Sequence, residues 1–365
     1  MPAVEQSMSA FHGGRFWEAY GERFERVFTS NAIPADVLDA WYPPAPGVVE
    51  ALTQDLPKLA RTSPPVDGAG LVQAISEARH ISAESICIGA GSSSLMYSVL
   101  PRYMAPGDTM LVYDPIYGEY PHLAEVCGCR VLPAAGLPRF ELGLSANPRL
   151  AVLVNPVNPT GEHLPPDRIL GLVEAHPNTV FWVDEAYLEY APGARTLEPE
   201  AATRHNLIVC KSLSKVYALS GMRAAYLVAH PDSAIEIKRW TPPWAIGTAA
   251  QLAAVRSLED PAYYAERHAE TAKLRQTLAG EVRFGKVSHG CLNAVLIDLG
   301  APIAEQFVVE ARKEGVFLRD VTSMGSTFNG RVIRIAVRPP DEIPRLLDVV
   351  NETGKSLAIG SLAPR

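Results

Sequence analysis

The stretch Cys210–Arg223 (CKSLSKVYALSGMR) brings Ser212, Ser214, Lys215 and Arg223 together in a short length of chain. Lys215 has apolar neighbours and a cation nearby, and a lysine in such surroundings loses its proton more easily, which suits Schiff-base chemistry. Ser212, Ser214 and Arg223 supply neutral and cationic donors to a phosphate. The stretch therefore indicates a phosphate clamp beside a reactive amine, with a solvated helix start as the alternative.

Two further stretches follow short apolar runs that are typical of strands. Ser92 and Ser93, in GAGSSS, begin a helix-like segment, where free backbone N–H groups can bind an anion. Such Gly/Ser turns also begin many helices that bind nothing. Asn158 lies in the turn NPVNPTG, whose prolines make it stiff and suit holding the Asn158 amide in one orientation.

Four more side chains are candidates, and each has a simple structural alternative. Tyr117, in DPIYGEY, could stack on a planar ligand or pack on the core. Asp184 follows a buried run and can pair with a cationic ligand group, although solvated acids are common at strand ends. Arg334 lies in the alternating run VIRIAV, and Arg338 follows four residues later, so both face the same side of a strand. A lone strand arginine usually lies on the surface.

The elements that must position these residues alternate along the chain from about residue 70 to 230. Short β-branched runs separated by helix-like stretches predict βαβ units and a mostly parallel sheet, whose ligands gather at the carboxyl ends of the strands. The predicted strands are Ser85–Ile88, Thr109–Val112, Leu150–Val154, Thr179–Val183 and Asn206–Val209. Further along, a smaller α+β region is predicted from Pro261–Leu278, Asn293–Leu299 and Val332–Val337.

A chain of 365 residues is longer than one ordinary core holds, which predicts two domains. We expect an α/β fold, with a three-layer α/β/α large domain around a mostly parallel sheet and a smaller α+β domain. The predicted bounds are 48–250 for the large domain and 251–365 for the small one. Residues 1–47 are expected to join the small domain to the mouth of the active site.

Composition restricts the classes of partner. The net charge of −7, with both signs interleaved, argues against nucleic acid and membrane surfaces, and no apolar run is long enough to cross a bilayer. The N-terminus lacks the layout of a signal peptide, so a cytoplasmic location is expected. The five cysteines are expected to be free thiols, and Cys127 and Cys129 have no second pair at metal-ligand spacing, so no metal site is predicted.

The order of these motifs along the chain resembles a known family. NPVNPTG, VDEAY and SLSKVYALSGMR, in this order and spacing, are similar to fold-type I enzymes dependent on pyridoxal 5′-phosphate (PLP). Within them the chain resembles the class I/II aminotransferase family, in the branch of histidinol-phosphate aminotransferase and threonine-phosphate decarboxylase. The resemblance runs from about Asp36 to the C-terminus.

The resemblance implies PLP as the cofactor and a role for each residue. Lys215 holds PLP as an internal aldimine and moves a proton between the substrate and the cofactor. Asp184 keeps the ring nitrogen protonated, which PLP needs to withdraw electrons. Arg334 takes the substrate α-carboxylate. Asn158 and Tyr187 contact the ring oxygen, Tyr117 stacks on the ring face, and Asn293 lies near the substrate carboxylate. The residues implied to hold the phosphate are Ser92, Ser93, Ser212, Ser214 and Arg223.

The sequence departs from that family in several places. The region 60–67 (ARTSPPVD) lacks the Tyr-Pro pair whose tyrosine reaches the phosphate of the partner subunit's cofactor, and Ser93-Ser94 replaces a common Asp-Glu pair. Arg319 and Arg338 either read an anionic group of the substrate or are surface charges. The segment Trp41–Pro44 either covers the active-site mouth or anchors the domains to each other.

The expected function is that of a PLP-dependent aminotransferase acting on a small amino substrate, an α-amino acid or an amino phosphate, in specialised metabolism. A decarboxylase, a lyase or an oxidative deaminase on the same scaffold is the alternative. A catalytically inactive regulatory module is disfavoured, because Lys215 is present and the acidic chain has no room for a basic DNA-binding domain before Asp36. The resemblance also implies a homodimer with no nucleic-acid or membrane partner.

Overall fold

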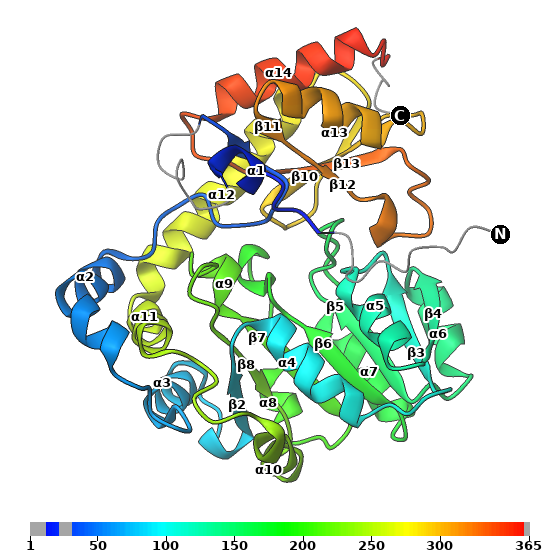
Figure 1. Ribbon diagram of the computed structural model, residues 1–365. Helices are drawn as coiled ribbons and strands as arrows, with labels where there is room; N and C mark the ends of the chain where they lie inside the picture. Colours follow the sequence, from blue (N-terminus) through cyan, green and yellow to red (C-terminus); the bar gives the residue numbers. More distant parts are fainter. Residues whose placement is uncertain (1–11, 22–30, 361–365) are drawn as a thin grey trace.

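The computed structural model describes residues 12–21 and 31–360 and shows two layered regions, with the larger one at the bottom of Figure 1. A seven-stranded sheet forms the centre of the larger region. Its strands are, from edge to edge, β2 (Ile86–Gly89), β8 (Ala225–Val228), β7 (Leu207–Ser212), β6 (Val180–Asp184), β5 (Leu150–Val154), β3 (Thr109–Asp114) and β4 (Arg130–Ala135). All neighbours pair in parallel except β8, which is antiparallel to β2 and β7.

Strand β5 shows why this sheet is buried on both faces. Its residues are all apolar and buried, and they alternate between two hydrophobic clusters, as side chains of a strand do. Leu150 and Val152 face the cluster that includes residues of α4 (Ser92–Val99), α5 (Glu119–Val126) and α10 (Pro231–Trp240). Ala151 and Leu153 face α3 (Ala69–Arg79), α6 (Leu137–Leu144), α7 (Pro166–Ala175) and α11 (Thr248–Leu258). The predicted α/β/α layering is therefore confirmed.

The smaller region is built on a four-stranded antiparallel sheet. Its order is β12 (Arg319–Asp320), β13 (Val332–Ala336), β10 (Ala294–Asp298) and β9 (Lys286–Ser288). Three helices pack on it or on each other, namely α12 (Pro261–Glu281), α13 (Ala304–Lys313) and α14 (Ile343–Ser356). The expected α+β character of this part of the chain is therefore present.

The N-terminal segment contacts the smaller region. β1 (Ile33–Pro34) pairs in parallel with β11 (Val316–Phe317), and Glu18 of α1 (Trp17–Tyr20) forms an ion pair with Arg312 of α13. Helix α2 (Pro46–Arg61) then packs against α11. Residues 1–11 and 22–30 of the predicted joining segment lie outside the described residues, and the three predicted domain bounds stay a prediction.

The segment Trp41–Pro44 lies between the two regions. The Trp41 indole donates to the Thr271 hydroxyl of α12 at 2.8 Å, and the Tyr42 hydroxyl donates to the carbonyl of Val216 at 2.9 Å. Neither aromatic residue lines the cavity of about 230 Å³ at the ends of β5, β6 and β7, so the anchoring interpretation of this segment fits the structure better than the covering one. Among the described helices, none combines the length and the apolar character that a membrane crossing requires.

Candidate active site

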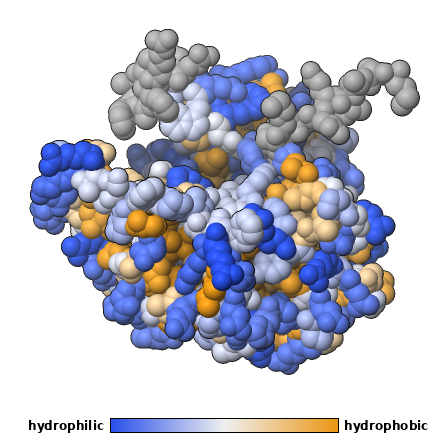
Figure 2. All heavy atoms as spheres, turned by 60° about the horizontal axis from the view of Figure 1, so that its bottom comes forward, coloured by the Kyte–Doolittle hydropathy of each residue, from blue (hydrophilic) through white to orange (hydrophobic). Residues whose placement is uncertain are grey.

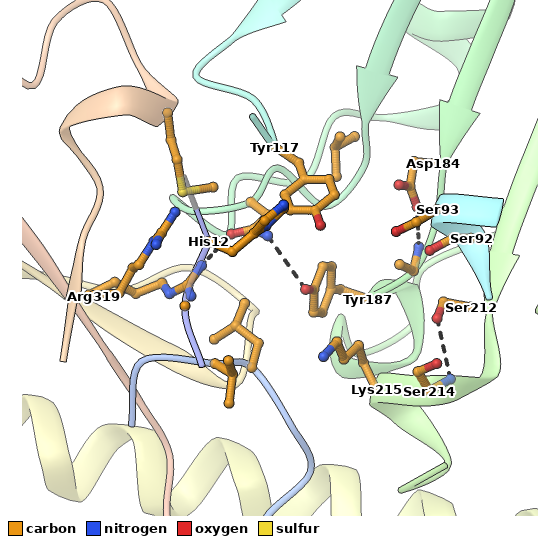
Figure 3. A pocket seen from close by; sticks show the side chains of 18 of the residues that line it. His12, Ser92, Ser93, Tyr117, Asp184, Tyr187, Ser212, Ser214, Lys215 and Arg319 are labelled. Carbon is orange, nitrogen blue, oxygen red and sulfur yellow. Dashed lines mark hydrogen bonds between the residues drawn. The ribbon is translucent and has the colours of Figure 1, made fainter. Parts of the chain in front are cut away.

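A cavity of about 230 Å³ opens where β5, β6 and β7 end. Val154, Asp184 and Ser212, the last residues of these strands, line it together with side chains from the smaller region. Figure 3 shows four serines at one end and Arg319 at the other. The polar lining residues are His12, Asp36, Ser92, Ser93, Tyr117, Asn158, Asp184, Tyr187, Ser212, Ser214, Lys215, Arg223, Arg319 and Arg334.

The end of the cavity with the serines is built to receive an anion. The N-terminus of α4, which begins with two serines, opens onto it, and helix N-termini favour negative charge. Arg223 donates to the Ser214 hydroxyl at 3.2 Å, and its guanidinium passes directly over Gly91. A Cβ atom at residue 91 would lie 2.3 Å from the Arg223 Nη2 atom, so the close approach requires glycine. These donors converge on one place that the described side chains do not fill.

Asp184 is a buried carboxylate on the wall of the cavity. The Tyr120 hydroxyl donates to its Oδ2 at 2.7 Å and the backbone N–H of Ala186 to its Oδ1 at 3.0 Å. The Trp182 indole in turn donates to the Tyr120 hydroxyl at 2.9 Å, which fixes the phenol. Burial raises the pKa of Asp184 more than these hydrogen bonds lower it. A cationic ligand group beside Asp184 would therefore be stabilised by the carboxylate and would stabilise its ionised form.

The middle of the cavity holds an amine, an amide and two phenols. The Asn158 amide donates to the Tyr187 hydroxyl at 3.4 Å, and Lys215 and Tyr117 lie on either side of Tyr187 (Figure 3). Burial raises the pKa of Tyr187, which remains a neutral hydrogen-bonding group. The side chains thus leave a space between Asp184 and Lys215 with a phenol ring, Tyr117, on its border.

The opposite end carries two arginines from adjacent strands. Arg319 and Arg334 are paired residues of β12 and β13, and both line the cavity although both are buried. Arg334 donates to the Asn158 Oδ1 atom at 2.8 Å and to the carbonyl of Asp36 at 3.1 Å, while its Nε has no hydrogen-bond partner among the described residues. Burial, assisted by the charge of Arg334, lowers the pKa of Arg319 to about 10. Two buried guanidiniums side by side favour an anionic ligand group.

A buried ionic network supports the strand ends from behind. Lys211, which precedes Ser212, places its amine 3.0 Å from Glu189 and 3.5 Å from Glu185. Arg79 forms a second ion pair with Glu189 at 3.0 Å. Burial raises the pKa of Glu185 to about 7, whereas the charges of Lys211 and Arg79 outweigh burial at Glu189 and lower its pKa to about 2. The network ties β6 to β7 immediately beside the cavity.

The structure brings together most of the residues that the sequence indicated. All the predicted cofactor contacts line the cavity, as do Arg319 and Arg334. Asn293 and Arg338 do not line it. Asn293 is fully buried and donates to the carbonyls of Leu38 and Asp39, and Arg338 forms an ion pair with Glu342 at 2.9 Å. The substrate contacts predicted for these two residues stay predictions.

Sequence reasoning missed the two polar side chains that the N-terminal segment contributes to the cavity, those of His12 and Asp36. The Asp36 carboxylate accepts hydrogen bonds from the backbone N–H groups of Gly14 at 2.6 Å and Arg15 at 3.0 Å, which draws His12 to the cavity. The His-Gly-Gly sequence was the available signal, because a Cβ atom on Gly13 would lie 2.5 Å from the carbonyl oxygen of Asp36. The His12 Nε2 atom also contacts the Glu119 carboxylate.

Comparison with known proteins places the chain in a family. Residues 28–350 match the family described as aminotransferase class I and II. The chain belongs to this family. It is 31% identical over 325 residues to histidinol-phosphate aminotransferase 2 of Pseudomonas fluorescens, and the match covers 84% of each chain.

Solved structures agree with this class I and II aminotransferase fold. Histidinol-phosphate aminotransferase of Sinorhizobium meliloti, solved in complex with PLP, is 24% identical, with a TM-score of 0.83 covering 96% of this chain and 100% of that one. L-threonine-O-3-phosphate decarboxylase of Porphyromonas gingivalis is 20% identical, with a TM-score of 0.76 covering 87% of this chain and 97% of that one. The predicted family and its fold are confirmed.

Enzymes of this aminotransferase family use PLP, and this chain is a PLP-dependent aminotransferase. The cavity fits the group in three independent respects. At one end, Gly91 leaves room for the Arg223 guanidinium beside the serines, which makes an anion site. On the wall, the buried Asp184 carboxylate accepts hydrogen bonds from neutral donors among the described residues. The Lys215 amine also lines the cavity. Phosphate, ring nitrogen and aldehyde are the three groups of PLP that need such partners.

Other potential ligands lie elsewhere in the aminotransferase. His205, His230 and Asp232 could together offer three atoms to a metal ion, but none of the three lines the cavity, and the cluster is largely exposed. The cysteines Cys87, Cys127, Cys129, Cys210 and Cys291 are all free thiols, and none lines the cavity.

Proposed function

We propose that this aminotransferase acts on a small amino substrate that carries an anionic group, with Lys215 as the amine that binds PLP and moves the proton. One observation carries the proposal: the Lys215 amine, the Asp184 carboxylate and the buried pair Arg319 and Arg334 line a single cavity. The relatives named as histidinol-phosphate aminotransferases support it, because a phosphorylated amino substrate would bring such an anion.

The residues divide the work of holding the cofactor. Ser212, Ser214, Arg223 and the first turn of α4 would bind the phosphate, and Asp184 would hold the proton on the ring nitrogen. The ring oxygen would accept hydrogen bonds from the amide and phenol of Asn158 and Tyr187, and Tyr117 would cover the ring face. When bound, PLP supplies an electron sink for the pair left behind as a bond at the substrate α-carbon breaks.

The remaining side chains act on the substrate. Arg334, with Arg319 beside it, would bind the anionic group and so fix which bond of the α-carbon faces the Lys215 amine. That amine would take the proton from the substrate α-carbon and would hold it for return to the other carbon attached to the substrate nitrogen. The choice of the Cα–H bond distinguishes transamination from decarboxylation, in which the bond to the carboxylate breaks instead.

The deciding experiment mixes the purified holoenzyme with a panel of amino compounds in the absence of a keto-acid acceptor. The panel contains histidinol phosphate, phosphothreonine, glutamate, aspartate, arginine and alanine. Accumulation of pyridoxamine phosphate is expected, fastest with a compound that carries a phosphate or a second carboxylate. Release of CO2 with unchanged cofactor would show a decarboxylase instead, and oxygen uptake would show oxidative chemistry. Lys215→Ala, which should lack the visible absorbance of bound PLP, is the control.

We further propose that the enzyme is a homodimer. Three large apolar side chains are exposed in α10 or in segments that lie near it: Val66 is 61% exposed, Trp240 56% and Trp244 54%. The backbone N–H of Trp244 donates to the Val66 carbonyl, and a second cavity of about 510 Å³ lies beside them. Figure 2 turns this side forward and shows hydrophobic side chains exposed among polar ones. Such a patch is typical of a protein interface.

Sedimentation analysis tests the dimer. The protein should sediment at about twice its chain mass of 39.5 kDa, and Trp244→Glu should shift it toward the monomer because a charge would be buried in the interface. A wild-type protein that sediments at the chain mass at micromolar concentration would contradict the proposal. A cytoplasmic location is proposed as well, supported by the five free thiols, which persist in reducing compartments.

A further inference from the structure

Asp39, which belongs to none of the sequence motifs, contacts the amine at the centre of the site. The Lys215 Nζ atom donates to the Asp39 Oδ1 atom at 2.7 Å, and the two form an ion pair. Their side chains are 24% and 38% exposed, so the pair lies at the edge of the cavity and not in bulk solvent. Leu38, the residue before Asp39, lines the cavity itself.

The chain on either side of Asp39 is held in place by residues distant in sequence. The Asn293 amide donates to the carbonyls of Leu38 at 3.3 Å and Asp39 at 3.4 Å. Arg334 donates to the carbonyl of Asp36, three residues earlier. The backbone from Asp36 to Asp39 is thus attached to Arg334 of β13, at the arginine end of the cavity, and to the residue that precedes β10. This gives Asn293 a structural role outside the cavity.

The groups that face Asp39 make it an anion at neutral pH. Burial acts to raise its pKa, but the charge and hydrogen bond of Lys215, a hydrogen bond with Ser220 and the charge of Arg338 outweigh burial, so the pKa lies below its usual value. The phenols of Tyr187 and Tyr190 also couple to Asp39, and burial raises the pKa of each, so both stay neutral. The Lys215 amine therefore faces a permanent negative charge.

We propose that Asp39 is a positioning residue, which holds the Lys215 amine at the cavity edge and stabilises the positive charge that this amine gains during proton transfer. The inference rests on the proposed role of Lys215. In that step the Cα–H bond of the substrate breaks, an N–H bond forms at Nζ, and the electron pair stays with the substrate carbon. Asp39 remains ionised throughout and accepts a hydrogen bond from the ammonium that results.

The proposal gives a direction to each measurable property of Asp39→Asn. The amide keeps the size of the side chain and one oxygen acceptor, but it removes the charge. An opposite charge within hydrogen-bond distance favours the charged form of a group, so losing it disfavours a protonated nitrogen at Lys215. The Lys215 nitrogen should therefore lose its proton at lower pH in the variant, both when free and when bound to the cofactor.

The first measurement uses the cofactor-free protein and does not depend on activity. Lysines are acylated at about pH 8, and peptides are quantified by mass spectrometry with the exposed Lys355 as the internal reference. Labelling of Lys215 should rise about 10-fold in Asp39→Asn, since the neutral amine is the nucleophile. Asp55→Asn, which removes the exposed acid beside Lys58, is the matched control and should leave Lys215 labelling unchanged.

The second measurement follows the visible absorbance of the holoenzyme as the pH is raised. The midpoint should fall by about one pH unit in Asp39→Asn and should stay near the wild-type value in Asp39→Glu, which retains the charge. The kcat for the first half-reaction should fall about 10-fold with KM changed less than about twofold, because the substrate anion is held elsewhere.

The outcomes separate the two proposals. An unchanged midpoint and unchanged labelling in a variant with the wild-type melting temperature would overturn the role of Asp39 alone. If the Lys215→Ala variant keeps the visible absorbance band of the wild-type holoenzyme, the proposed role of Lys215 is wrong instead. Should Asp39→Asn not fold, Asp39→Glu still decides: a midpoint displaced by more than about one pH unit with the charge retained would contradict the electrostatic role.

Discussion

The two ends of the active-site cavity are assembled in different ways. The phosphate end and Asp184 come from short motifs, each following a strand of one sheet, and each motif carries its own turn geometry. The arginine end comes from β12, β13 and the segment before α2, and the hydrogen bond from Arg334 to the Asp36 carbonyl joins residues 298 positions apart. The first end is local in sequence, while the second exists only after the two regions have packed together.

The ends also differ in charge, and this difference matches the ligand expected at each. Near the serines, the hydrogen-bond donors to the buried Asp184 carboxylate from the described residues are the neutral groups of Tyr120 and Ala186, and burial raises its pKa. At the other end burial lowers the pKa of Arg334. Burial thus disfavours the charged form of both Asp184 and Arg334, and a bound ligand group of opposite charge would stabilise that form. Substitutions at the two ends should therefore affect different steps.

The largest effect is expected from Asp184→Asn. The amide cannot hold a proton on a ring nitrogen by charge, and its NH2 group would face the Tyr120 hydroxyl or the Ala186 N–H, both of which donate to residue 184. Loss of one partner from a buried charged contact costs about 3–5 kcal/mol, so turnover should fall roughly 10²- to 10⁴-fold. Single-turnover kinetics at saturating PLP measures the loss. A fall of less than about threefold would show that the carboxylate does not contact the ring nitrogen.

Arg334→Lys should produce the next largest effect, and only at the substrate end. Lysine cannot reproduce the guanidinium that contacts both Asn158 and Asp36 and still presents an N–H to the cavity. A charge-assisted hydrogen bond contributes about 1.5–3 kcal/mol, so kcat/KM should fall roughly 10- to 100-fold while the Kd for PLP stays within about twofold.

Arg331→Lys is the control for this substitution, because Arg331 pairs with Asp298 and its side chain is 42% exposed. It should leave both constants unchanged. If Arg334→Lys weakened PLP binding as strongly as it weakened substrate turnover, the separation of the two ends would be wrong.

The same division explains how much could be predicted from the sequence. The predicted strand Leu150–Val154 has the bounds of β5, and four others lie within a few residues of β2, β3, β6 and β7, because a strand buried on both faces of a sheet is a continuous apolar run. The prediction missed β4, which contains Pro133 and has an exposed edge residue, Arg130. It also missed β8, whose four residues follow an irregular turn that contains Arg223 with a positive φ of 57°.

The site residues also fall into those that the local sequence predicts and those that it does not. Lys215 and Asp184 could be found because PLP chemistry constrains their immediate neighbours in sequence. Arg338 was grouped with Arg334 by strand spacing, yet β13 ends at Ala336, so the two arginines do not share a face and Arg338 turns to Glu342. Asp39 could not be found, since its partner is 176 residues away and nothing in the surrounding sequence marks it.

The buried ionic network of Lys211, Arg79, Glu185 and Glu189 should make the stability of the protein depend on pH, and Glu189 should account for the acid part of that dependence. Its pKa is lowered in the folded protein to about 2 from 4.5, so its contribution to stability is present above about pH 4.5 and is lost as the pH falls toward 2. Glu189→Gln should lower the free energy of unfolding at neutral pH by roughly 2–3 kcal/mol and remove part of the acid dependence.

Glu185→Gln provides the opposite case. The pKa of Glu185 is raised to about 7 in the folded protein, so stability falls as the pH rises from about 4.5 through 7. Its amide variant should therefore have a flatter profile in that range. Melting temperatures of both variants between pH 3 and 8 test the pair. Parallel profiles for the two variants would mean that the network does not carry the charges assigned to it.

The smallest effect is expected from Ser214→Ala at the phosphate end. The Ser214 Oγ atom accepts a hydrogen bond from Arg223, which leaves its own proton available to an anion in the cradle. One such hydrogen bond contributes about 1 kcal/mol, so the Kd for PLP should rise roughly fivefold with the substrate KM unchanged. Ser98 lies on α4, as Ser92 and Ser93 do, but its hydroxyl donates to the Ser94 carbonyl. Ser98→Ala should therefore change neither the Kd for PLP nor the substrate KM. A larger rise in KM than in Kd would place Ser214 at the substrate end and remove the distinction between the two ends.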